Sequence, residues 1–259
     1  FNKFDVPDYI FNLTNNVPWN KLYLKEFITK NKLQYQAIKQ ANDTYFTIMA
    51  LFLAERITYV KDVLIAYRVN NDESLSGKAS DTVFCAYDSW LYAKEHIEKY
   101  PDFNLVRFSF LNRALSGFYH ALNIQTTFES YEKLYRKLVE EGFHEFGLDE
   151  CTEENIYAVW MYKDMQKMYE TEPADFLVQK SITRRVNNEN NNVRRKILRE
   201  KNAVLRENVQ ALKEDKKTLQ SDKKKLQEEK KKLEGEKKKL QKEIDNIKQS
   251  KAYRLGNKL

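Results

Sequence analysis

The fold of this 259-residue chain is decided by residues 17–68, which read VPWNKLYLKEFITKNKLQYQAIKQANDTYFTIMALFLAERITYVKDVLIAYR. In the middle of this stretch a lone acid, Asp43, precedes apolar residues spaced i, i+3, i+4 and i+7, namely Phe46, Met49, Ala50 and Leu53. This spacing is typical of one face of an amphipathic helix, and Asn42, Asp43 or Thr44 can cap its start. The sequence therefore predicts a helix that begins at a carboxylate. The plain alternative is that Asp43 is only an N-cap, which stabilises a helix by about 1 kcal/mol.

The residues on either side of this helix carry different patterns. Residues 57–60 and 63–69 are β-branched and aromatic, which predicts a hairpin or two neighbouring short strands. On the other side, Pro18 gives a rigid entry to a helix over about residues 21–30. Burial habits favour a core position for Trp19.

Five short motifs in this order carry a resemblance to a known family: VPWNKLY at 17–23, KEF at 25–27, NDTYF at 42–46, AERI at 54–57 and AYR at 66–68. Together they resemble the acceptor-side half of family 2 glycosyltransferases. The resemblance continues more loosely to about Ile182 and does not cover the tail in detail. It implies the C-terminal part of a GT-A α/β domain, which would leave a small β remnant in an otherwise mainly α chain.

The resemblance also implies a site and a reaction. Asp43 would be the general base of an inverting sugar transfer, and Trp19, Lys21, Asn42 and Arg68 would bind substrate. The substrates would be a nucleotide sugar and a glycan or lipid-linked acceptor, in the assembly of cell-surface polysaccharide or glycan. Asn42 departs from the family, which more often has Glu before the acid. In the family the segment after the YR motif, here the polar loop 68–80, approaches the reaction centre, so we expect a lid there.

The family's other half carries the nucleotide-binding strands and an Asp-x-Asp metal motif, and no Asp-x-Asp occurs in this sequence. We therefore expect the chain to be the C-terminal portion of a larger hexosyltransferase-type enzyme and to be inactive alone. A divalent metal, Mg or Mn, is expected only with the other half, and no metal or cofactor site is expected here. The expected location is the cytoplasm, or the inner face of the membrane as a peripheral protein.

Composition limits the other classes of site. Cys85 and Cys151 lie far apart, which argues against a disulfide framework or a zinc site and favours buried free thiols. No run of 18 apolar residues occurs, so no transmembrane helix is predicted. Only six glycines are present, which favours helices over a turn-rich β fold. Residues 79–183 are predicted to form a helical bundle, with a last short helix starting at Pro173.

The tail, residues 184–259, contains a seven-residue repeat. One heptad position, which we label d, is aliphatic throughout: Leu198, Leu205, Leu212, Leu219, Leu226, Leu233, Leu240 and Ile247. Four of the seven a positions are lysines, Lys216, Lys223, Lys230 and Lys237, so the coiled-coil seam is only half apolar. We expect one continuous helix over residues 193–248 and a weak homodimer through it. With residues 1–78 as the glycosyltransferase part and 79–183 as the bundle, this gives three predicted domains.

Two alternatives to an enzyme fragment remain. The first is a non-catalytic helical interaction module that is oligomerised by a coiled-coil stalk. The second is binding of nucleic acid or anionic lipid by the tail, because residues 194–248 hold 20 Lys and Arg against 11 acids. These lysines alternate with acids, and aromatic residues are absent until Tyr253, which argues against a nucleic-acid platform.

Overall fold

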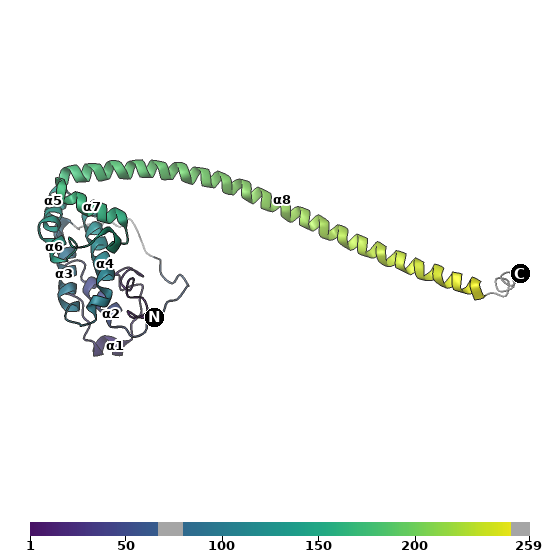
Figure 1. Cartoon of the computed structure of the whole chain (residues 1–259), viewed down its shortest axis with the longest axis horizontal. Helices are drawn as coiled ribbons and strands as arrows, with labels where there is room; N and C mark the ends of the chain where they lie inside the picture. The colour runs from purple at the N-terminus through teal and green to yellow at the C-terminus, as the bar shows by residue number, and fades with distance from the viewer. Residues whose placement is uncertain (67–79, 250–259) are drawn as a thin grey trace. The chain divides into compact units, whose positions relative to one another are not determined.

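The computed structural model describes residues 1–66 and 80–249, and within these ranges it is helical, with no β-strand. The helices are α1 Lys25–Lys30, α2 Asp43–Leu53, α3 Cys85–Ile97, α4 Phe103–Asn123, α5 Phe128–Lys137, the π-helical η2 Leu138–Gly142, α6 Phe143–Glu145, the 3-10 helix η3 Glu153–Asn155, α7 Val159–Glu170 and α8 Pro173–Gln249 (Figure 1). The predicted mainly α class is confirmed. The chain divides into two units, Phe1–Ile182 and Thr183–Leu259.

The predicted β remnant is wrong for the residues that can be assessed. Residues 57–66 form no strand, and the rest of the predicted hairpin, 67–69, lies outside the described residues. Tyr59, Val60, Val63 and Leu64 are each between 67% and 94% exposed. A sequence with strand propensity becomes a strand only when another segment supplies hydrogen bonds, and none of the described residues pairs with 58–66.

The core of the first unit is built around α2. Every residue from 46 to 52 is buried, so the helix is covered on all sides rather than along the single predicted face. Its Tyr45 packs edge-on against Tyr92 of α3, with ring centroids 4.9 Å apart. Helix α3 also packs against α4, where Trp90 and Phe110 meet edge-on at 5.6 Å. Gly117 permits the close approach of α3 and α4, because a Cβ there would lie 2.3 Å from Nε1 of Trp90.

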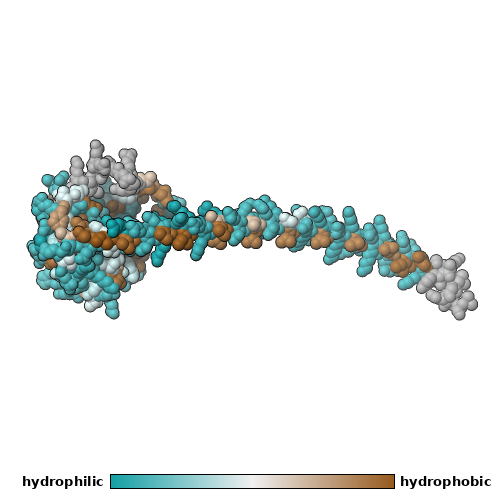
Figure 2. Space-filling view, turned by 90° about the horizontal axis from the view of Figure 1, so that it is seen from above, coloured by the Kyte–Doolittle hydropathy of each residue, from teal (hydrophilic) through white to brown (hydrophobic). Residues whose placement is uncertain are grey.

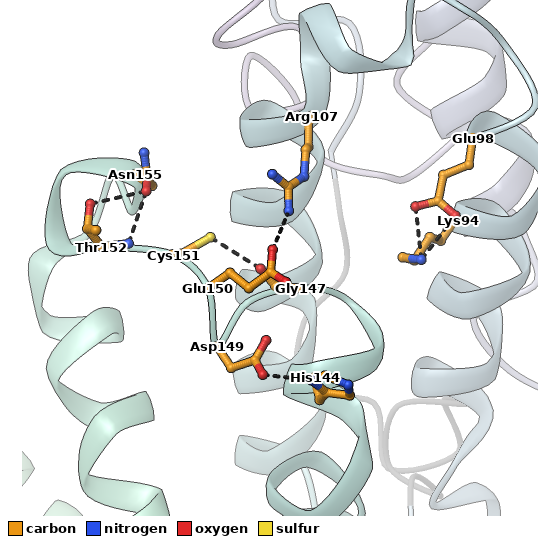
Figure 3. Close-up of polar contacts among 10 residues, drawn as sticks. All are labelled: Lys94, Glu98, Arg107, His144, Gly147, Asp149, Glu150, Cys151, Thr152 and Asn155. Atoms are coloured by element: carbon orange, nitrogen blue, oxygen red, sulfur yellow. Dashed lines mark hydrogen bonds and ion pairs between the residues drawn. The ribbon is translucent and has the colours of Figure 1, made fainter.

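Polar contacts fasten the loop that follows α6 (Figure 3). Arg107 of α4 donates to Glu150 over 3.5 Å, and Nδ1 of His144 lies 2.8 Å from a carboxylate oxygen of Asp149. This hydrogen bond to Asp149 raises the pKa of the exposed His144. Gly147 makes the turn between His144 and Asp149 with a φ of +68°, a left-handed conformation that favours glycine.

Helix α8 confirms the predicted tail helix and extends it. The short helix predicted at Pro173 is not separate, because one helix runs from Pro173 to Gln249. Proline fits its start because the first helical position needs no backbone donor. The eight aliphatic d residues are between 58% and 69% exposed, and Figure 2 shows hydrophobic side chains, in brown, recurring along this helix. Whether they pair in a coiled coil stays a prediction.

Three smaller expectations are corrected. The first helix starts at Lys25 rather than Lys21, and Leu22 is 99% exposed. Trp19 is 46% exposed, so the predicted core position is wrong. Cys151 is buried but Cys85 is only half-buried, and both thiols are free. Among the described residues, no helix is long and apolar enough to cross a membrane.

Candidate active site

The candidate site lies at the start of α2, where Asp43 is the first helical residue, as predicted. The N-cap position belongs to Asn42, which makes no capping hydrogen bond through its side chain, so the interpretation of Asp43 as the N-cap is wrong. A left-handed residue just before it, Ala41 with a φ of 59°, turns the chain into the helix. The positive end of the helix dipole favours a carboxylate at this position.

Burial dominates the protonation of Asp43. Loss of water around the half-buried carboxylate raises its pKa, while the backbone N–H of Asp43 itself and the charge of Lys21 both lower it. The net effect is a raised pKa. A carboxylate with a raised pKa binds a proton more strongly, which suits a general base.

Lys21, in the segment before α1, is close enough for its charge to act on this carboxylate. Its Nζ donates to the carbonyl oxygens of Asn15 and Val17, at 2.6 Å and 2.7 Å, and to Oδ1 of Asn20 at 2.9 Å. These three acceptors satisfy the three ammonium hydrogens. Burial lowers the pKa of Lys21 to about 8, and the charge of Arg113 lowers it further to a smaller extent. The charge of Asp43 opposes both effects. The side chain is therefore still mostly charged at pH 7.

Arg113 comes from α4, far away in sequence, and burial lowers its pKa. Its Nε donates to Oδ1 of Asn16 over 2.8 Å. The carbonyl oxygen of Asn16 in turn accepts from Oγ1 of Thr47, on α2, at 2.9 Å. Asn16 thus ties the segment that carries Lys21 to both α2 and α4, which fixes Lys21 relative to Asp43.

An aromatic wall lies beside these charges. The ring of Phe46 stacks on Tyr35 at 4.6 Å and meets Tyr23 edge-on at 5.1 Å. Burial raises the pKa of Tyr23 to about 12, so its hydroxyl keeps its proton at neutral pH. The charge of Asp43 contributes to the raised pKa of Tyr23, so this wall lies close to the acid.

The structure brings together only some of the predicted site residues. Asp43 and Lys21 interact, and Asn42 is exposed directly beside Asp43. Trp19 is near Lys21 in sequence and half exposed, while Arg68 and most of the predicted lid, 68–80, lie outside the described residues. Sequence reasoning missed Arg113, Asn16 and Thr47. The only available signal was a charged residue, Arg113, in the apolar run of α4.

The described residues offer no set of metal ligands, since no three His, Cys, Asp or Glu side chains converge within 1–66 and 80–249. What the arrangement offers instead is a carboxylate with a raised pKa near one partly desolvated cation, Lys21, whose own pKa is lowered by Arg113. Comparisons with known proteins add no relative: no family model, no curated protein and no solved structure matches the chain.

Proposed function

We propose that this chain is the acceptor-side part of an inverting, nucleotide-sugar-dependent glycosyltransferase, and that Asp43 is its general base. The proposal is supported by the five motifs in residues 17–68 and, above all, by one structural observation. Asp43 begins α2, burial raises its pKa, and the charge of Lys21 opposes that rise. A carboxylate at an ordinary surface cap would be solvated and would need no such partner.

In the proposed reaction, an acceptor hydroxyl approaches Asp43 and gives its proton to the carboxylate. The acceptor oxygen forms a bond to the anomeric carbon of the donor sugar as the bond from that carbon to the phosphate oxygen breaks. The nucleoside diphosphate leaves with the bonding electron pair, and the configuration at the carbon is inverted. Proton removal by a placed carboxylate accelerates such reactions by about 10²–10⁴-fold.

Lys21 keeps the base in its working form. The positive charge of Lys21 lowers the pKa of Asp43 and so favours the ionised carboxylate, while burial keeps its proton affinity high. The divalent metal implied by the resemblance would be held by the other half of the enzyme, where it would stabilise the leaving nucleoside diphosphate.

The test uses the enzyme produced from the whole coding region, with UDP- and GDP-sugars as donors and nucleoside diphosphate release as the readout. Asp43→Asn should lower acceptor-dependent release by about 10²–10⁴-fold and leave nucleotide-sugar binding, measured by calorimetry, unchanged. Asp88→Asn is the matched control, because burial also raises the pKa of Asp88 but its charged partner is Lys137. Equal turnover of the two variants would refute the assignment of Asp43.

A second function, a non-catalytic interaction module, is favoured by α8. Its aliphatic d residues remain more than half exposed along the helix, and a surface stripe of this kind is typical of a coiled-coil partner site. This function predicts self-association without sugar transfer. It would be preferred if the whole coding region gave no donor-dependent release with any nucleotide sugar.

A further inference from the structure

The segment before α1 holds two cations at neighbouring points. Nζ of Lys21 donates to the carbonyl oxygens of Asn15 and Val17, at 2.6 Å and 2.7 Å. Nε of Arg113, on α4, donates to Oδ1 of Asn16 over 2.8 Å. Three consecutive residues therefore anchor an ammonium group and a guanidinium group, although Arg113 comes from a helix that is distant in sequence.

Most of the guanidinium of Arg113 is left for a ligand. An arginine side chain has five N–H donors, and among the described residues only Nε finds an acceptor. No ion pair joins Arg113 or Lys21 to an acid within residues 1–66 and 80–249. Arg113 is only half-buried, so the N–H groups on Nη1 and Nη2 remain accessible to a ligand from solvent.

The two positive charges affect each other. Burial lowers the pKa of Lys21 to about 8, and the charge of Arg113 is the second cause of this shift. Like charges that are partly removed from water repel each other, which destabilises the folded protein. A negatively charged ligand would offset this repulsion. The planar fork of a guanidinium also binds a carboxylate or a phosphate through two parallel hydrogen bonds.

The position of the two cations indicates which substrate would carry the negative charge. The charge of Lys21 acts on Asp43, and in the proposed reaction Asp43 takes the proton of the acceptor hydroxyl. Inversion requires the acceptor oxygen to attack the anomeric carbon from the side opposite the leaving nucleoside diphosphate. Groups beside Asp43 therefore lie on the acceptor side of the donor sugar.

We propose that Arg113 and Lys21 bind an anionic group of the acceptor, a phosphate or a carboxylate close to the hydroxyl that reacts. The inference rests on the proposed function and names the class of acceptor, which is a charged sugar or polyol rather than a neutral glycan. Arg113 donates hydrogen bonds to the anion through Nη1 and Nη2. Lys21 contributes its charge, because its own hydrogens are already bonded.

The test is a titration of the 259-residue chain with small anions, followed in NMR spectra by the Nε–Hε signal of Arg113 and the pKa of Lys21. Glycerol phosphate and glucuronate are the probes, glycerol and glucose are their neutral counterparts, and sodium chloride keeps the ionic strength constant. An anionic probe should shift the Arg113 signal to saturation and raise the pKa of Lys21 above about 8. The neutral compounds should change neither. The probe that binds more tightly identifies the group as phosphate or carboxylate, and equal affinities support both.

Three variants locate the binding. Arg113→Gln should weaken it by about tenfold or more, because glutamine keeps a donor for Asn16 and loses the charge and the fork. Arg113→Lys keeps the charge and loses the fork, so its affinity should be intermediate. Arg107→Gln is the matched control, because Arg107 is also on α4 but pairs with Glu150, and it should bind the probes unchanged. Thermal melts and amide spectra check that each variant is folded.

Three results would overturn the proposal. The first is an equal shift with neutral and anionic compounds, and the second is an equal affinity of Arg113→Gln and the unchanged chain. The third is loss of nucleotide-sugar binding by Arg113→Gln in the enzyme produced from the whole coding region, which would assign the two cations to the donor. The titration does not depend on activity. Anion binding without Asp43-dependent transfer would reject the proposed function alone, and Asp43-dependent transfer without anion binding would reject this site alone.

Discussion

Gly117 offers the sharpest test of the packing between α3 and α4. A Cβ at this position would lie 2.3 Å from Nε1 and 2.9 Å from Cε2 of Trp90. Trp90 is 3% exposed and packs edge-on against Phe110, so its ring cannot swing aside without losing another buried contact. Gly117→Ala therefore forces a rigid ring and a helix backbone apart.

The expected cost follows from two opposing effects. Overpacking of a core costs about 1–3 kcal/mol, and a contact this short with a rigid ring belongs near the top of that range. Replacing glycine by alanine inside a helix gains about 1 kcal/mol. The net loss of unfolding free energy is thus about 1–2 kcal/mol, or a fall in Tm of roughly 2–8 °C for a domain of this size. Calorimetry and near-ultraviolet circular dichroism of the tryptophans measure both quantities.

Two controls separate the effects. In a Trp90→Phe background the indole nitrogen is gone, so Gly117→Ala should cost less, and the double-mutant cycle gives the coupling free energy. Gly235→Ala tests helix propensity alone, because a Cβ there meets no atom within 4 Å. It should raise the helicity of α8. A Tm for Gly117→Ala equal to or above that of the unchanged protein, or the same change in both backgrounds, would refute this account of the interface.

Three further predictions concern charge and association. Asp43→Asn should stabilise the fold at pH 7. The pKa of Asp43 is raised in the folded protein, so the ionised carboxylate lowers the free energy of unfolding once the pH rises above the ordinary pKa of 3.8. Thermal melts at pH 3 should therefore show no gain for this variant. The pKa of Lys21 is lowered from 10.5 to about 8, so its ionisation destabilises the folded protein below pH 8 and the effect vanishes above pH 10.5. Lys21→Met should flatten the rise in urea stability between these values. Sedimentation at a protein concentration of roughly tens of micromolar should show a dimer whose association weakens as salt is added. The double variant Leu219→Asp and Leu226→Asp should be monomeric. A monomeric unchanged protein under all these conditions would exclude the coiled coil.

The parts of the fold that follow from local rules could be predicted from the sequence. Asp43 at a helix start and the long helix of the tail both depend on residues a few positions apart, whose spacing is visible in the chain. The burial of α2 on all sides was not visible, because it depends on which other helices pack around it. The unbroken course of α8 from Pro173 was not predicted either, because no local pattern joins the start of this helix to the heptads of the tail.

The charged surroundings of Asp43 show the same limit within the site. Lys21 lies in a motif next to the site in sequence, and the family resemblance pointed to it. Arg113 is 97 residues from Asn16, to which it donates a hydrogen bond. The hydrophobic periodicity of α4 cannot predict this contact, because α4 would be amphipathic whether or not Arg113 contacted Asn16. Its effect on the pKa of Lys21 becomes visible only when the helices are packed.

The prediction of strands in residues 57–66 is wrong for a physical reason. A helix satisfies its backbone hydrogen bonds within itself, so a local pattern is enough to form it. A strand satisfies its backbone only through a neighbour, so the same strength of local pattern yields a strand only where the neighbour is present. Residues 57–65 keep a β-branched and aromatic composition on either side of Lys61 and Asp62. They lack a pairing segment among the described residues, so no strand forms there.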